Sequence, residues 1–160
     1  MWTAPAWSQP AAESRGDPAQ QTLAKAYVAA VDAGDADALR RLLHPAVRAC
    51  IDDTTRPLFD WVTARELRGR PRSSSFRIAP VGSAGTLMAF LPPNLVRYPI
   101  EPTHEIHWEF ALNSTRSRTV IRQIAMVDGA WFIVLPCPTA EGVEAFKRRQ
   151  QESGREREPR

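Results

Sequence analysis

The period of the hydrophobic pattern changes along the chain, and this change limits most strongly what the chain can fold into. Apolar residues recur at helical spacing over residues 23–31 and 39–43, which predicts two amphipathic helices near the start. Later segments alternate apolar and polar residues, which predicts half-buried strands. The 14 prolines, against 8 glycines, argue against an all-helical chain because each proline removes a backbone donor. The sequence therefore predicts an α+β fold.

Residue types that favour helix ends mark the two predicted helices. Asp17 followed by Pro18 suits the start of the first helix, and Gly34 suits its end. Asp35 or Asp37 can then cap the second helix, whose apolar positions follow at once. The first helix is thus expected to run over most of residues 18–33.

Strands are predicted to fill most of the chain after the second helix. Alternation over 47–53 predicts the first strand, with 55–59 as a short partner strand. Asp60 can cap a third helix over 61–68. The remaining predicted strands, the last two joined by an Asp128-Gly129 hairpin turn, are 75–81, 104–112, 118–127 and 130–135.

The length of 160 residues is that of a single domain. We predict a flexible leader over 1–17, one domain over 18–138, and a short helix followed by a basic disordered tail over 139–160. Residues 82–103 are rich in proline and too apolar for a free linker. Such a long loop inside a domain is usually functional, so we expect it to cover a pocket or to shape a partner surface.

The charge pattern limits the partners that we expect. The formal net charge is +3, and much of the basic excess lies in the tail without interleaved aromatic residues. This pattern gives no platform for stacking nucleic-acid bases, so a nucleic-acid partner is not expected. No apolar run approaches the length of a membrane helix, so no membrane span is expected. The sequence shows no glycine-rich phosphate loop and no zinc motif, so we expect no cofactor and no metal.

The two cysteines and the start of the chain leave the compartment open. Cys50 and Cys137 are either two separate small buried residues, which we favour, or a disulfide formed in an oxidising compartment. Their spacing alone does not decide between these readings. The start lacks the regions of a signal peptide, which favours the cytoplasm. An exported protein is the alternative, if Met1 replaces a signal peptide that was removed.

Two segments carry a resemblance to a known superfamily. Residues 26–45, AYVAAVDAGDADALRRLLHP, combine a helix, a Gly-Asp turn, a Leu-Leu helix and a His-Pro pair, and residues 126–133, MVDGAWFI, resemble a final hairpin. The pattern resembles the nuclear-transport-factor-two-like superfamily over residues 18–136. That superfamily includes ketosteroid isomerases and polyketide cyclases. The resemblance implies a strongly bent antiparallel sheet that wraps around the N-terminal helices, a conical pocket between them, and a homodimer formed through the outer face of the sheet.

The resemblance also indicates which side chains would face such a pocket. Tyr27 lies on the apolar face of the first helix, and Asp53 and His104 share the parity of the apolar residues in their predicted strands. We take Tyr27, Asp53 and His104 as candidate acid–base catalytic residues. A core tyrosine and a turn-forming aspartate are the alternatives for Tyr27 and Asp53. The other expected pocket-lining residues are Trp61, Trp108, Phe110 and Arg122.

Two charged regions of the predicted sheet need separate explanations. Arg122 shares the parity of Val120 and Ile124, so it would be buried at a cost unless it pairs with Asp53 or an anionic ligand. Glu105 and His107 face the opposite way from His104, so the two histidines cannot hold one metal ion. We expect His107 on the outer face or in an interface.

The sequence supports two classes of function. In the first, the chain is a cone protein that binds a small apolar ligand and catalyses a cofactor-independent lyase, isomerase or cyclase reaction by general acid–base chemistry. In the second, it is a non-catalytic binding or assembly module, exported or not, whose cone is filled by its own side chains. An open cavity with convergent polar groups would favour the first class, and a filled interior would favour the second.

Overall fold

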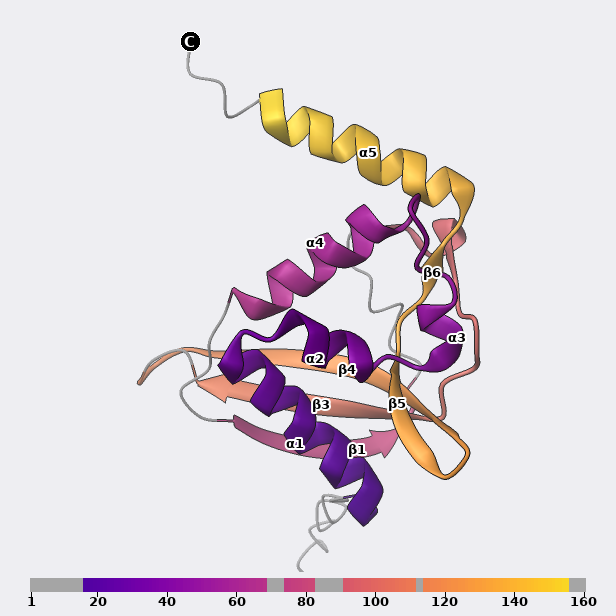
Figure 1. Ribbon diagram of the computed structural model, residues 1–160. Helices are drawn as coiled ribbons and strands as arrows, with labels where there is room; N and C mark the ends of the chain where they lie inside the picture. The colour runs from indigo at the N-terminus through magenta and orange to yellow at the C-terminus, as the bar shows by residue number, and fades with distance from the viewer. Residues whose placement is uncertain (1–15, 69–73, 83–90, 112–113, 156–160) are drawn as a thin grey trace, which may run out of the picture.

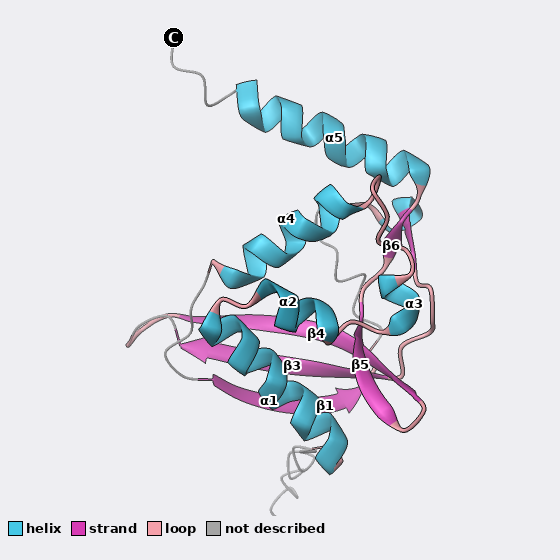
Figure 2. Ribbon diagram, viewed as in Figure 1, coloured by secondary structure: helices cyan, strands magenta, loops and turns pink. Residues whose placement is uncertain are grey.

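The protein is an α+β fold in which helices precede a four-stranded antiparallel sheet (Figure 1). A computed structural model describes residues 16–68, 74–82, 91–111 and 114–155. Figure 2 shows that helices α1, α2 and α4 lie on the same side of the sheet. The helices of the described residues are α1 (Pro18–Ala33), α2 (Ala36–Arg41), α3 (Pro45–Arg48), α4 (Arg56–Leu67) and α5 (Ala140–Arg155).

Helix α1 begins and ends at the residues that the sequence predicts. The Asp17 carboxylate accepts a hydrogen bond from the Gln20 backbone N–H at 2.8 Å, and the Gln20 side chain accepts one from the Asp17 backbone N–H at 3.0 Å. This reciprocal pair satisfies two donors at the start of the helix. Gly34 ends the helix with a left-handed φ of 68°. Asp35 caps α2 by accepting from the Ala38 N–H at 2.8 Å.

Four long strands form the main sheet, in the order β1-β3-β4-β5, and every neighbouring pair is antiparallel. Asp128 and Gly129, with φ values of 50° and 78°, form the predicted turn between β4 and β5. A second, two-stranded sheet pairs β2 with β6. The strands are β1 (Ser74–Pro80), β2 (Val96–Arg97), β3 (His104–Ala111), β4 (Ser117–Val127), β5 (Ala130–Val134) and β6 (Cys137–Pro138), and a short 3-10 helix covers Pro93–Leu95.

The core lies between the helices and the inner face of the sheet. Ile106, Trp108 and Phe110 of β3 are buried there, as their shared parity predicts. The Trp108 ring stacks on the Tyr27 ring of α1 at 4.3 Å between centroids, and its Nε1 donates to the Ala24 carbonyl at 3.2 Å. This contact fixes α1 across the sheet, because aromatic stacking is combined there with a satisfied indole donor.

Two strand predictions are wrong. Residues 47–53 form the end of helix α3 and a turn, and 55–59 enter helix α4, which continues past Asp60. The backbone of residues 42–44 is attached instead to β5: the His44 N–H donates to Ile133 O, and the Ile133 N–H donates to Leu42 O, each at 2.8 Å. The short alternation after Pro45 therefore does not reflect a strand, since helical hydrogen bonds and this bridge decide the path of the chain.

The C-terminal helix is longer than predicted, and several predictions fall outside the described residues. Helix α5 extends to Arg155 and so takes up most of the segment 139–160, for which the sequence predicted a short helix and a disordered tail. Val143 and Phe146 are buried, whereas residues 147–154 are exposed, so the second half of α5 extends away from the body (Figure 1). Leader residues 1–15, loop residues 83–90 and tail residues 156–160 lie outside the described residues. No helix in the described part of the chain has the length and apolar character needed to cross a bilayer.

Candidate functional site

A small cavity lies between α1, α4 and the inner face of the sheet. Its volume is about 20 Å³, which leaves room for about one water molecule. Apolar and polar side chains surround it, and three of the polar ones, from separate elements, bind one another there: Tyr27 from α1, Glu66 from α4 and Arg122 from β4. The remaining lining residues are Leu39, Arg40, Leu43, Ile51, Phe59, Val62, Thr63, Ile133 and Leu135.

Glu66 lies at the centre of this polar group and accepts from both neighbours. Its Oε2 accepts a hydrogen bond from the Tyr27 hydroxyl at 3.2 Å. Its Oε1 accepts from Arg122 Nε at 2.8 Å and also from Arg122 Nη2. Arg122 Nη1 donates to the Ile121 carbonyl at 2.7 Å. The side chains of Arg122 and Glu66 are only 14% and 9% exposed, so this is a buried ion pair held by several hydrogen bonds.

Burial and the neighbouring charges fix the protonation of this group. Burial raises the pKa of the Tyr27 hydroxyl well above its ordinary value, and the negative charge of Glu66 raises it further. Burial alone would lower the pKa of Arg122, but its interactions with Glu66 and Tyr27 together raise this pKa overall. Tyr27 is therefore a neutral hydrogen-bond donor, and Arg122 stays charged.

The arrangement is chemically satisfied rather than open for reaction. A general acid or base needs a substrate within hydrogen-bond distance, and ligand pockets usually measure about 300–1,000 Å³. A cavity of about 20 Å³ holds no such substrate. The Glu66 carboxylate is also occupied by the two side chains that it binds. In this conformation, the three groups stabilise one another.

The structure does not bring the three predicted catalytic residues together. Tyr27 faces the cavity, but Asp53 lies in an exposed turn between α3 and α4. His104 lies at the start of β3, where its ring contacts the Trp131 ring edge-on at 5.1 Å and its Nδ1 is 3.0 Å from Thr103 Oγ1. Asp53 and His104 do not line the cavity. Asp53 is displaced because the strand that would have turned it inward does not form.

The predicted pocket-lining residues have different environments. Arg122 lines the cavity, but its partner is Glu66, not Asp53 or a ligand. Trp108 and Phe110 are buried in the core and do not line it. Trp61 contacts Phe146 of α5 at 6.0 Å between ring centroids. Trp61 therefore joins α4 to α5, away from the cavity.

Sequence reasoning missed Glu66, although a signal for it was present. Phe59, Val62 and Glu66 are spaced by three and four residues, so they share one face of a helix. Phe59 and Val62 line the cavity with Glu66. The prediction began the third helix at Trp61, which removed Phe59 from the pattern. A helix that begins at Arg56, as α4 does, turns Glu66 to the inside.

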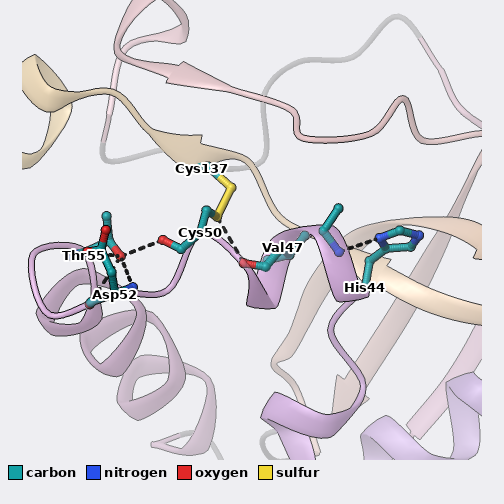
Figure 3. Close-up of a disulfide and its surroundings, with 7 residues drawn as sticks. His44, Val47, Cys50, Asp52, Thr55 and Cys137 are labelled. Atoms are coloured by element: carbon teal, nitrogen blue, oxygen red, sulfur yellow. Dashed lines mark hydrogen bonds between the residues drawn. A yellow bond between two sulfur atoms is a disulfide. The ribbon is translucent and has the colours of Figure 1, made fainter.

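The cysteines form a disulfide, so the favoured prediction of two separate buried cysteines is wrong. Cys50 and Cys137 are bonded, with 6.3 Å between their Cα atoms. Figure 3 shows that the bond joins the turn after α3 to strand β6. The adjoining turn is held by its own side chains: the Thr55 hydroxyl donates to Cys50 O at 2.7 Å, and the Asp52 carboxylate accepts from the Thr55 N–H at 2.9 Å. Hydrogen bonds from the Thr55 and Thr54 backbone N–H groups lower the pKa of Asp52, and the hydroxyl of Thr55 fixes the chain beside Cys50.

Comparison of the chain with protein-family models, with curated proteins and with solved structures finds no match.

Proposed function

We propose that this chain is a non-catalytic binding or assembly module of the nuclear-transport-factor-two-like type, with a cone filled by its own side chains. The observation that carries the proposal is the interior: a cavity of about 20 Å³ in which Tyr27, Glu66 and Arg122 bind one another. A ligand would have to displace this buried ion pair, and leaving one buried charge unpaired costs about 3–5 kcal/mol. The module would therefore use its surface for binding.

The disulfide supports a place of action outside the reducing cytosol. Disulfides persist in oxidising compartments and are rare in the cytosol, where thiols are kept reduced. Cys50 and Cys137 are both consumed in the bond, so the described chain has no free cysteine. We propose that the protein is exported.

Binding of small apolar molecules tests whether the interior is filled. We expect toluene to cause no NMR shift at Tyr27 or Val62 in the natural protein. In the variant Phe59→Ala, which removes a buried ring beside the cavity, toluene should bind, as small apolar molecules bind engineered cavities. Leu39→Ala is a milder second variant at the same cavity. Toluene shifts at Tyr27 in the natural protein would contradict the proposal.

A ligand-binding acid–base enzyme is the second candidate, because three polar groups do converge on one cavity. In that case the interior must open, and Glu66 would be the group that exchanges Arg122 for a ligand. The toluene experiment separates the two candidates: an interior that opens admits a probe, and a filled one does not. The expected homodimer stays a prediction, and sedimentation equilibrium measures it directly.

A further inference from the structure

The outer face of the sheet, opposite the helices, carries a second group of polar side chains. Alternate residues of β1, β3 and β4 point to this face. A hollow of about 280 Å³ lies there, lined by Ser75, Phe76, Arg77, His107, Glu109 and Thr119. Its volume is close to the lower end of small-ligand pockets, about 300 Å³. The interior cavity lies on the other side of the sheet, so the two sites are separate.

Three side chains form a hydrogen-bonded chain at one side of this hollow. Arg77 Nη2 lies 2.9 Å from His107 Nδ1, and His107 Nε2 lies 2.6 Å from Glu105 Oε1. A guanidinium only donates, so Nδ1 must accept and the imidazole proton must be on Nε2. His107 is therefore a neutral imidazole that donates to Glu105. The side chains of His107 and Glu105 are each 11% exposed, so this end of the hydrogen-bonded chain is well buried.

This hydrogen-bonded chain anchors one nitrogen of the exposed Arg77 guanidinium and leaves its other donors to spare. His107 holds one nitrogen of the guanidinium, and the other N–H groups have no hydrogen bond to a described residue. Holding the side chain in place beforehand reduces the entropy lost when a ligand binds. Arg77 is thus a preorganised donor for a carboxylate, which guanidinium groups bind with two parallel hydrogen bonds.

The opposite charge lies within reach along the next strand. Glu109 is opposite Ser75 on β1 and Thr119 on β4, and Arg77 is opposite His107. Arg77 and Glu109 are thus diagonal neighbours, whose spacing is typically about 7–8 Å. Neither has an ion-pair partner within the described residues. The hollow presents one positive and one negative group, with a hydroxyl on each side of Glu109.

We propose that this hollow binds a small zwitterion of the amino-acid class. Arg77 holds the carboxylate, Glu109 holds the ammonium group, and Ser75 and Thr119 hydrogen-bond to the polar atoms between them. A monoanion would meet the repulsion of Glu109, and a monocation would meet that of Arg77, so a ligand with both charges fits best. This proposal is separate from the proposal of a filled interior, because the hollow on the outer face and the interior cavity do not depend on each other.

A series of ω-amino acids tests the charge spacing in the hollow. Glycine, β-alanine, γ-aminobutyrate and ε-aminocaproate are titrated into the protein at millimolar concentration, with butyrate and butylamine as singly charged probes, and backbone amide NMR shifts are followed. We expect one length to bind best, with shifts at Ser75, Arg77 and Glu109. Each singly charged probe should bind about fivefold more weakly, the loss expected for one partly exposed ion pair.

Variants assign the two charges separately. Arg77→Gln should weaken binding of the zwitterion about fivefold, the loss expected for one partly exposed ion pair, and should abolish binding of butyrate, which has no other charged partner in the hollow. Glu109→Gln should remove the preference for the zwitterion over butyrate. Arg97→Gln is the matched control, because Arg97 is an exposed arginine on β2 that does not line the hollow. Equal binding to the natural protein and to Arg77→Gln, or no shift in the hollow with any member of the series, would overturn the proposal.

His107 is a positioning residue in this proposal, and its role has its own readout. Protonated His107 carries a hydrogen on Nδ1, which cannot accept from Arg77, so the guanidinium loses its support. The charged groups around His107 are Arg77 on β1 and Glu105 and Glu109 on β3, while its β4 neighbours Thr119, Ile121 and Gln123 are uncharged.

We expect His107→Ala, which offers Arg77 no acceptor, to bind the zwitterion more weakly than the natural protein. His107→Gln should restore part of the binding, because its amide oxygen can accept from Arg77. Equal binding by His107→Ala and the natural protein would remove His107 from the proposal. This outcome is independent of the toluene experiment, so the two proposals can fail separately.

Discussion

At the scale of single residues, Arg122 shows how a strand can force a charge into the core. Its parity on β4 is that of Val120 and Ile124, both buried, so its side chain starts on the inner face. A charge in that place is stable only when paired and hydrogen-bonded. Glu66 supplies the pairing, and Tyr27 hydrogen-bonds to the other oxygen of Glu66. The three side chains therefore depend on one another.

A double-mutant cycle measures this dependence. Glu66→Leu leaves Arg122 buried without a partner, which should lower the free energy of unfolding by about 3–5 kcal/mol. The double variant Glu66→Leu/Arg122→Met removes both charges, and its stability should return to that of the natural protein or exceed it. Urea unfolding checks both values. Asp60→Asn, at the exposed pair of Arg40 and Asp60, is the control and should change stability by less than about 1 kcal/mol. If the double variant is no more stable than Glu66→Leu, the loss of stability in Glu66→Leu does not come from leaving Arg122 unpaired.

At the scale of elements, the start of α3 depends on a histidine. His44 Nδ1 accepts from the Ala46 N–H at 3.1 Å, so the imidazole proton lies on Nε2. Nε2 is buried and has no hydrogen-bond partner among the described residues. Burial lowers the pKa of His44, and the positive charge of Arg48 lowers it further. The helix therefore requires the neutral form of His44.

This requirement predicts a pH dependence of stability. In the unfolded chain, a histidine takes up a proton near pH 6.5, whereas folded His44 takes it up only at lower pH. The unfolded state then binds more protons between these two values, so the free energy of unfolding should decrease as the pH falls below about 6.5. In the variant His44→Asn, the side-chain amide oxygen can cap α3 in place of the imidazole, and the side chain does not titrate. Urea unfolding between about pH 5 and 8 should show a smaller decrease for His44→Asn, and equal decreases in both proteins would contradict the assignment.

At the scale of the whole molecule, the disulfide adds a covalent link close to the backbone bridge between residues 42–44 and β5. Cys50 follows α3, and Cys137 belongs to β6, which pairs with β2 in the described part of the chain. The bond spans 87 positions of sequence. A loop of that size restricts the unfolded chain strongly. The disulfide therefore contributes to stability mainly by limiting the unfolded state.

Removing the disulfide should cost about 4.6 kcal/mol in the free energy of unfolding, by the loop-entropy relation. The variant Cys50→Ala/Cys137→Ala is measured by urea unfolding beside the natural protein. The natural protein is also measured with added dithiothreitol. Its free energy of unfolding should decrease by a similar amount without any substitution. A thiol count without reductant should find no free thiol. Two free thiols, or a loss below about 1 kcal/mol, would contradict the structural role given to the bond.

The sequence by itself determined the parts whose residues act locally. Asp17 and Gly34 set the ends of α1 because capping involves only nearby backbone groups. Alternation over 104–112 predicted the burial of Ile106, Trp108 and Phe110, since alternate residues of a strand point to one face. Asp128-Gly129 predicted its hairpin because the turn needs two residues with positive φ. The α+β class follows from these elements.

Only the tertiary structure decided which distant residues meet. The backbone bridge from residues 42–44 to Ile133 turned the segment after Pro45 into a helix and a turn, and so removed Asp53 from the interior. The pairing of Arg122 with Glu66 joins residues 56 positions apart. The disulfide joins residues 87 apart. A pattern in one segment carries no information about a partner in another, because such contacts are set by the packing of whole elements.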